Sequence, residues 1–329
     1  MASNLLIYGA RSGIQKAVRR GDPRLAKACF DIIWEEPEHR KWLLWRLPVL
    51  VFEDCWPMAG ELAKAQKENA KLSAEDSKKA WQRFVILLTI ARKNQDAAWL
   101  WYLAKHGEKN FDNAEFLLMR EIVSAIPGDT PGKLPGFVLQ EKLREASSRE
   151  LTDYEKQACH VIEARRISGG MVSDQWNAIS AQVLIHLRGL PEEGVLGMIE
   201  EQRAVYSKLP IRPVTALPWF CFDMHTRPGQ LAMRVWLKNH KTPMLNDEEK
   251  LGTVWFQLTS AELGGMVLPQ YDSIGRGAAR WFETIWQREK EESIALWLGV
   301  SVAEMKRHWQ ANLQKVQELV EWAIRKNTE

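Results

Sequence analysis

The capping-box pattern constrains the fold of this chain more than any other feature of its sequence. In this pattern a Ser or Thr stands three residues before an acid, and the two side chains cap each other's backbone N–H groups at the start of a helix. It precedes three apolar-periodic stretches, at Ser73 and Asp76, at Thr152 and Glu155, and at Ser301 and Glu304. Alternating apolar and polar stretches bounded by Asn-Gly or Asp-Gly, which mark β-hairpins, do not occur. We therefore predict an all-α protein, a globular multi-helix fold without a substantial sheet.

Size and composition favour a soluble protein with a large core. The 329 residues, 46% of them hydrophobic, are enough for one large domain or two. The longest apolar run, RFVILLTIA, lies between Arg83 and Arg92 and is well short of the roughly 20 residues of a membrane span. The NLLIY start is too short for a signal peptide. We expect a cytoplasmic protein without membrane association.

No motif points to a metal or a cofactor. The four cysteines, Cys29, Cys55, Cys159 and Cys221, stand singly, with no CxxC pair and no His at ligand spacing. They are expected to be reduced core thiols. The chain also lacks the GxxxxGK[ST], GxGxxG, HExxH and GxSxG motifs, so Walker-type nucleotide hydrolysis is not supported. We predict no metal site and no cofactor.

A Pro- and Gly-rich stretch suggests a division of the chain. Residues 126 to 137, IPGDTPGKLPGF, hold three prolines and three glycines. We predict a loop or linker at 127–137 between an N-terminal helical region, 1–126, and a C-terminal helical region, 138–329. The two regions either form separate domains or share one core.

The stretch YGARSGIQKAVRRGD, residues 8 to 22, carries four cations and no acid before Asp22. We expect a helix that Gly21 closes in the left-handed conformation, with Asp22 and Pro23 starting the next helix. Two neighbouring polar stripes follow from helical spacing, one of Arg11, Gln15 and Arg19 and one of Ser12, Lys16 and Arg20. They form either an ordinary solvated face or a phosphate-facing surface, because the net charge of the chain is only +3 and any affinity for nucleic acid must be local.

Other candidate residues each have a structural and a functional interpretation. Asp223 and His225 in FDMHTRPGQ either support acid–base chemistry or only cap a turn and fill the core. Asp112 is either the N-cap of the next predicted helix or a functional carboxylate beside Asn113. The cations of ARKN, Arg92 and Lys93, stand at the predicted end of an apolar helix, where they complement the helix dipole.

Four of these stretches resemble a known helical region. SGIQKAVRRGD, FED at 52–54, ARKN and DMHTRPG resemble, in the same order, the helical C-terminal region of the RarA/MgsA-type clamp-loader relatives. The AAA+ ATPase module of that family is missing from this sequence. The resemblance implies clamp-loader-collar-like helical packing. The shared polar positions are Ser12, Gln15, Lys16, Arg19, Arg20, Asp54, Lys93, Asp223, His225 and Thr226.

The length and the YGARSGIQKAVRRGD start are similar to a second group, the bacteriophage-replication-inhibiting DNA glycosylases. This resemblance implies antiphage defence by excision of glucosylated hydroxymethylcytosine from phage DNA. Water would release the base and leave an abasic site, without a lysine nucleophile, and the enzyme would act as a monomer. The alternative is a non-catalytic, collar-like accessory protein of DNA replication or repair that forms a ring or binds a partner ATPase. A third reading is a phage-sensing module that keeps only the basic face.

The glycosylase interpretation assigns a role to each candidate residue and requires the first helix to converge with the FDMHT segment. The expected catalytic residues are Asp112, Asp223 and His225. The expected substrate-binding residues are Tyr8, Arg11, Ser12, Gln15 and Asn113. The expected DNA-binding residues are Lys16, Arg19, Arg20, Arg92 and Lys93.

Overall fold

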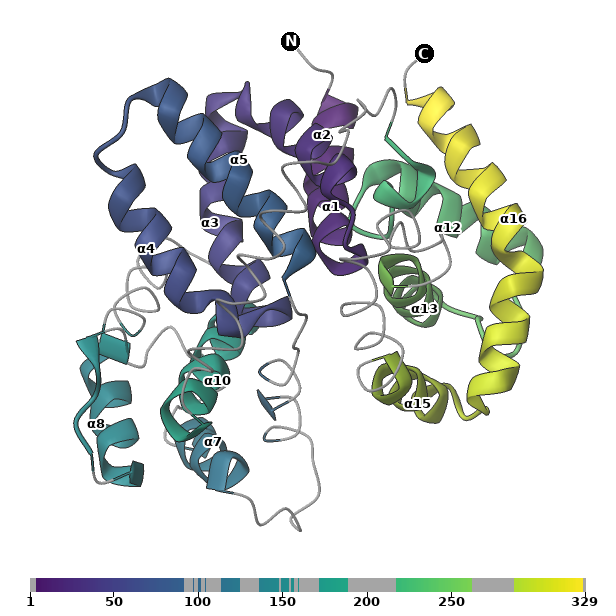
Figure 1. Ribbon diagram of the computed structural model, residues 1–329. Helices are drawn as coiled ribbons and strands as arrows, with labels where there is room; N and C mark the ends of the chain where they lie inside the picture. The colour runs from purple at the N-terminus through teal and green to yellow at the C-terminus, as the bar shows by residue number, and fades with distance from the viewer. Residues whose placement is uncertain are drawn as a thin grey trace. The chain divides into compact units, whose positions relative to one another are not determined.

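The computed structural model describes residues 4–91, 97, 100–101, 104, 114–124, 136–147, 149–153, 155–156, 159, 172–188, 217–261 and 287–327. All regular secondary structure in these residues is helical, with no β-strand among them, which confirms the predicted all-α fold (Figure 1). None of the described helices has the length and hydropathy of a membrane span. The four cysteines are buried free thiols, as predicted.

The chain forms two compact units, and each combines segments that are distant in sequence. The first consists of residues 1–43, 85–90 and 201–329, and the second of residues 44–84 and 91–200. Each unit therefore draws on both of the predicted regions, 1–126 and 138–329. Of the predicted loop, residues 127–135 lie outside the described residues, and Gly136 already begins a helix.

The first unit is built around an N-terminal helical pair. Helix α1 (Asn4–Arg20) packs against α2 (Pro23–Trp34), against α13 (Glu248–Ala261) and against the 3-10 helix η4 (Trp219–Cys221). Helix α12 (Arg227–His240) packs against α13 and against α16 (Val302–Lys326), and α15 (Gln287–Leu298) contacts α13 and α16.

The second unit holds most of the middle of the chain. It contains η1 (Trp56–Met58), α4 (Ala59–Asn69), α7 (Ala114–Ser124), α8 (Gly136–Ser147) and α10 (Val172–Arg188). Helices α7, α8 and α10 pack against one another. Helices α3 (Pro37–Asp54) and α5 (Ala74–Ile90) contribute residues to both units.

The helix ends confirm most of the capping residues that the sequence predicted. Gly21 has a positive φ of 68°, and Asp22 accepts hydrogen bonds from the N–H groups of Arg24 (3.1 Å) and Leu25 (3.0 Å) at the start of α2. Two of the predicted capping boxes are complete, at Thr152 and Glu155 and at Ser301 and Glu304. At the third, the Ser73 hydroxyl accepts from the N–H of Asp76 at 3.2 Å and donates to the Asp76 carboxylate at 2.7 Å.

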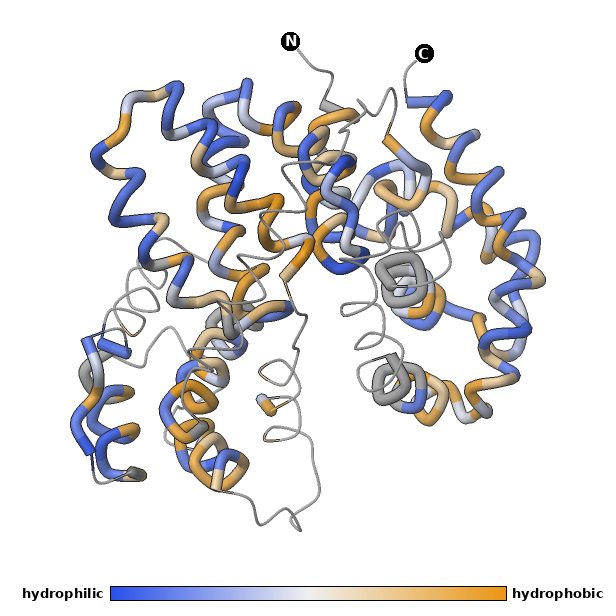
Figure 2. Tube along the Cα trace, in the orientation of Figure 1, coloured by the Kyte–Doolittle hydropathy of each residue, from blue (hydrophilic) through white to orange (hydrophobic). Residues whose placement is uncertain are grey.

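Amphipathic periodicity explains how α16 meets the rest of the first unit. Apolar bands recur along this helix in Figure 2. Its buried side chains are Met305, Trp309, Val316, Val320 and Ala323. Their spacing of three, four and seven places them on one side of a helix, so this side packs inward and the opposite side faces solvent.

Candidate functional site

A short, strongly constrained segment carries Asp223 and His225. After η4, the N–H and the hydroxyl of Thr226 both donate to the carbonyl oxygen of Asp223, each at 2.9 Å. The same hydroxyl accepts from the N–H of Gly229 at 3.2 Å and so caps α12. Asp223 and His225 are therefore held at the start of a helix by a closed turn.

Glycines allow this segment to lie directly against α1 and α12. A Cβ atom on Gly13 of α1 would lie 2.7 Å from the sulfur of Cys29 and 2.9 Å from that of Cys221. A Cβ atom on Gly229 of α12 would lie 1.8 Å from the carbonyl oxygen of Asp223, far inside van der Waals contact. Only glycine fits this close backbone approach without a shift of the segment.

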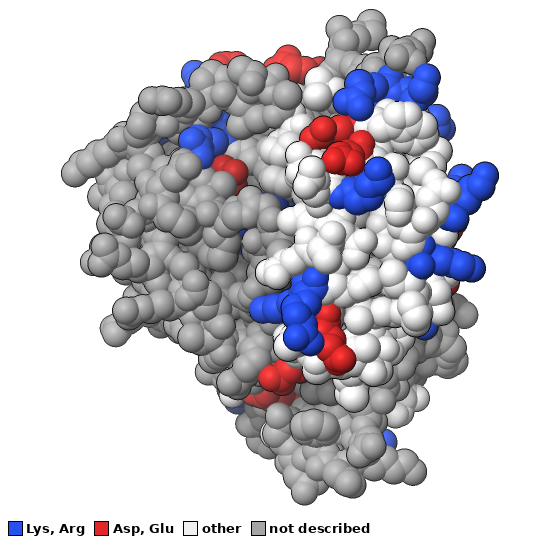
Figure 3. All heavy atoms as spheres, turned by 90° about the vertical axis from the view of Figure 1, so that its right-hand side faces the viewer, with Lys and Arg blue, Asp and Glu red and all other residues white. Residues whose placement is uncertain are grey.

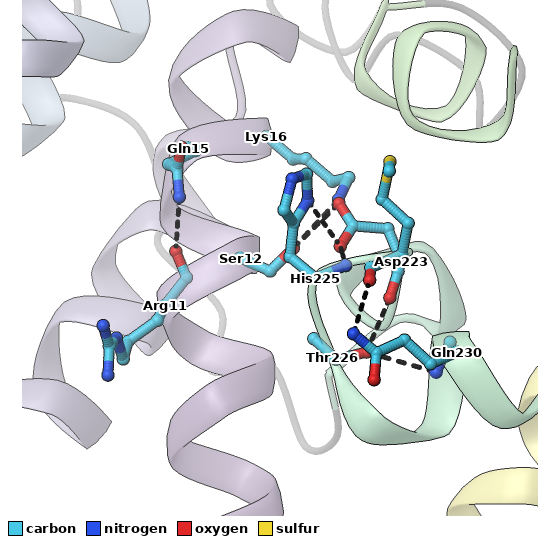
Figure 4. Close-up of polar contacts among 10 residues, drawn as sticks. Arg11, Ser12, Gln15, Lys16, Asp223, His225, Thr226 and Gln230 are labelled. Atoms are coloured by element: carbon cyan, nitrogen blue, oxygen red, sulfur yellow. Dashed lines mark hydrogen bonds and ion pairs between the residues drawn. The ribbon is translucent and has the colours of Figure 1, made fainter. Parts of the chain in front are cut away.

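The carboxylate of Asp223 joins the segment to α1 (Figure 4). Its Oδ2 atom accepts from the ammonium of Lys16 and from the hydroxyl of Ser12, the latter at 3.2 Å. Lys16 also donates to the Ser12 hydroxyl at 2.9 Å. Side chains that are 207 residues apart thus form one buried cluster, and the convergence that the glycosylase interpretation requires is observed.

Burial and charge act in opposite directions on this ion pair. Burial alone would raise the pKa of Asp223, but the Lys16 ammonium and the hydrogen bonds from His225 outweigh it and hold that pKa well below its ordinary value. Burial lowers the pKa of Lys16, and Asp223 opposes this. Burial raises the pKa of Cys221 to about 12, so the neighbouring thiol stays protonated. Asp223 is therefore a permanent anion at neutral pH.

His225 connects the buried anion to solvent. The backbone N–H of His225 donates to Oδ1 of Asp223 at 2.9 Å. The Nδ1 atom of its imidazole ring lies 3.3 Å from the same oxygen. The imidazole is 61% exposed, whereas the carboxylate is fully buried. With a proton on Nδ1 the ring donates to Asp223, and Nε2 is then the acceptor nitrogen. Asp223 therefore caps the turn, as the structural interpretation predicted, and also orients an imidazole. The expectation that His225 fills the core was wrong, because its ring is exposed, and the acid–base role stays a prediction.

Tyr8 and Arg11 lie near Ser12 on α1. The guanidinium of Arg11 lies 4.0 Å from the ring centroid of Trp42 and 5.3 Å from that of Tyr8. Tyr8 is 48% exposed and precedes Ser12 by one helical turn. Gln15 donates to the carbonyl oxygen of Arg11 at 3.3 Å. These predicted substrate-binding residues lie on α1, the helix whose Ser12 and Lys16 donate hydrogen bonds to Asp223.

The predicted basic face of α1 requires a correction. Lys16, Arg19 and Arg20 are all buried, so they do not form an exposed, phosphate-facing surface. Arg20 lies over the ring of Phe220, 3.8 Å from its centroid, and burial lowers its pKa to about 10. The expectation was wrong because α1 packs against α2, α13 and η4, and the segment that pairs with Lys16 is distant in sequence. The remaining candidates, Asp112, Asn113, Arg92 and Lys93, lie outside the described residues.

The second unit contains a buried polar cluster that sequence reasoning missed. The carboxylate of Glu155 accepts two hydrogen bonds from Arg149, at 2.7 and 3.0 Å, and one from the N–H of Thr152 at 2.7 Å. Nδ1 of His186 lies 2.8 Å from the same carboxylate. The capping box signalled the Thr152 contact, but nothing local in the sequence signalled His186 on α10.

Comparisons with known proteins leave the function to be argued from this geometry. The chain matches no family model, no curated protein and no solved structure. Within the described residues, no group of three or more His, Cys, Asp or Glu side chains lies close enough together to hold a metal ion.

Proposed function

We propose that the protein is a monofunctional DNA glycosylase that excises glucosylated hydroxymethylcytosine from phage DNA, as part of antiphage defence. The observation that supports it most is the meeting of Asp223 and His225 with Lys16 and Ser12 of α1. It gives an exposed imidazole a fixed orientation and a permanent buried anion behind it. This combination suits the activation of a water molecule.

Hydrolysis of an N-glycosidic bond needs a general base that takes a proton from water. It also needs surroundings in which positive charge can build up on the sugar. In the proposed step Nε2 of His225 accepts a proton from water, and the water oxygen bonds to C1′ of the deoxyribose. The bond between C1′ and the base nitrogen breaks, its electron pair leaves with the base, and solvent supplies the proton that the base takes up. The products are the free base and an abasic site.

Asp223 acts through His225 in this mechanism. Because its carboxylate is fully buried, it has no exposed surface with which to contact a substrate. It holds the Nδ1 proton of the imidazole and stabilises the imidazolium that forms when Nε2 gains a proton. Lys16 and Ser12 keep the carboxylate charged and fixed, so they are positioning residues.

Tyr8 and Arg11 provide groups for recognition on the same helix. An exposed tyrosine ring can stack on an extruded base, and the guanidinium beside it supplies hydrogen-bond donors for a base or its sugar decoration. Tyr8 precedes Ser12 by one helical turn, whereas Arg11 lies on the other side of α1 from His225 in Figure 4, so these two residues would meet the base or its decoration at the edge of the site and not at the imidazole.

The test compares phage DNA carrying glucosylated hydroxymethylcytosine with DNA of the same sequence carrying cytosine. After incubation with the full chain, free base and abasic sites are measured. We expect release from the modified DNA only. His225→Ala is expected to lower the rate by about 100-fold or more, the usual contribution of a positioned general base.

His240→Ala is the matched control, since it removes another exposed imidazole from the end of α12, one with no acid partner among the described residues, and should leave base release unchanged. If neither DNA releases base although both bind, the glycosylase proposal is wrong. The collar-like accessory protein then becomes the better hypothesis, and a partner ATPase should be sought.

A further inference from the structure

Helix α12 has a cationic face that begins beside His225. The helix contains no Asp or Glu, and its polar residues gather on the exposed side. At 100° per residue four of its exposed side chains fall within an arc of about 80°, whereas Asn239 and His240, which are also exposed, lie outside this arc at the end of the helix. The four are Arg227, Gln230, Arg234 and Lys238, which we call the α12 stripe.

The stripe differs from the other charged surfaces of the first unit. The face shown in Figure 3 carries Lys and Arg side chains in small groups with Asp and Glu between them. Helix α16 illustrates this mixture, because Lys315 pairs with Glu318 at 3.5 Å on its exposed side. On the α12 stripe only Arg234 has an acidic partner among the described residues, Glu248, at 3.6 Å. Both groups of that pair are exposed, so solvent screens their attraction.

We infer that the α12 stripe binds the phosphate backbone of the DNA strand that enters the site at His225. From Arg227 to Lys238 the stripe is about 16 Å long, given a rise of 1.5 Å per residue. One strand of a duplex presents a phosphate every 3.4 Å or so, so about five phosphates pass along this length. Three cations can therefore each meet a phosphate, and Gln230 adds an amide donor between them.

The inference replaces the binding role that the buried cations of α1 cannot fill. It rests on the proposed function for the choice of DNA as the ligand. A membrane surface is the weaker alternative, since a membrane-binding helix would expose large apolar side chains beside its cations. The large apolar side chains of α12 that the structure buries, Met233 and Trp236, point into the core.

The salt dependence of DNA binding tests the inference without any base release. Short unmodified DNA, both duplex and single-stranded, is titrated with the full chain between about 50 and 200 mM salt, where each lost phosphate contact lowers the slope of log K against log[salt] by about 1. In the triple variant Arg227→Gln, Arg234→Gln and Lys238→Gln, the magnitude of this slope is expected to fall by about 2 to 3. Its affinity at low salt is expected to fall by at least about tenfold.

Two further variants serve as controls. The triple variant Arg307→Gln, Lys315→Gln and Lys326→Gln removes the same formal charge from α16, and we expect it to leave the slope unchanged. Glu248→Gln removes the competitor of Arg234 and one negative charge, so it is expected to tighten DNA binding.

An unchanged slope in the α12 variant, or equal losses in both triple variants, would overturn the inference. Binding to vesicles of phosphatidylserine and phosphatidylcholine that depends on the stripe, with DNA binding unaffected, would also overturn it. The proposed function is tested separately by base release. A wild-type chain that binds DNA through the stripe but releases no base would refute the glycosylase and leave the inference standing.

Discussion

In each unit a buried carboxylate joins segments that are distant in sequence, Asp223 in the first and Glu155 in the second. Asp223 relies on an ammonium and a hydroxyl from a distant helix. Glu155 relies on Arg149, the backbone of Thr152 and His186. A buried anion is costly when its hydrogen-bond donors are removed. Each carboxylate therefore fixes the segments that supply its donors. The Asp223 cluster also presents a solvent-exposed imidazole, which is why we assign chemistry to that cluster.

Glu155 makes the free energy of unfolding depend on pH in the range between about 2 and 4.5. Burial alone would raise its pKa, but hydrogen bonds from Arg149, Thr152 and His186 lower it to about 2 from an ordinary value of 4.5. Because the folded pKa is the lower one, the stabilisation is complete above pH 4.5 and is lost as the pH falls toward about 2.

We predict that Glu155→Gln lowers the free energy of unfolding by roughly 1.5–3 kcal/mol at neutral pH, the usual worth of hydrogen bonds to a charged group. The difference from wild type should shrink as the pH falls below 4.5, as measured by urea denaturation at each pH. Glu150→Gln, at an exposed acid of the same unit, should show no such trend. A constant difference across this range would contradict the prediction.

At the scale of elements, the contact between the start of α12 and the backbone of Asp223 sets the geometry of the site. Gly229 permits that contact, and the Thr226 cap orients the helix. In most helices Gly→Ala is stabilising by roughly 0.5–1 kcal/mol, because alanine loses less entropy on folding. Here the added methyl group would meet a backbone oxygen, so the sign is expected to reverse.

We predict that Gly229→Ala destabilises the protein by about 1–3 kcal/mol, the usual cost of overpacking, and lowers the proposed base-releasing activity more than the loss of folded protein explains. The matched control is Gly299→Ala, at a positive φ of 71° with open space around its Cβ position. That change should also destabilise, through backbone strain alone, yet leave the rate per folded molecule unchanged. Equal effects of the two variants on the rate would count against the role of Gly229.

At the scale of the whole molecule, the sequence predicted what local signals encode. Helix class, the left-handed Gly21 and the caps at Asp22 and Ser301 depend on neighbouring residues and were predicted correctly. The meeting of α1 with Asp223 was predicted as a condition of the function. The burial of Lys16 was not, because it results from a pairing across 207 residues that no local pattern carries. The α12 stripe was overlooked although the absence of acids there was visible in the sequence.

Such long-range pairing implies that the first unit folds as one cooperative body from both ends of the chain. Lys16→Met should therefore affect α1 and α12 together, since it leaves Asp223 buried beside an apolar side chain at a cost of about 3–5 kcal/mol. The second unit, with its own core, should be spared. We predict that amides of α1 and α12 lose protection from hydrogen exchange to the same extent, while those of α7 and α10 keep theirs.

Lys79→Met, which breaks an exposed pair with Glu75 on α5, should change neither unit, because such pairs contribute little. Loss of protection confined to α1, or spread evenly through α7 and α10, would show that the first unit is not the cooperative body that its contacts indicate.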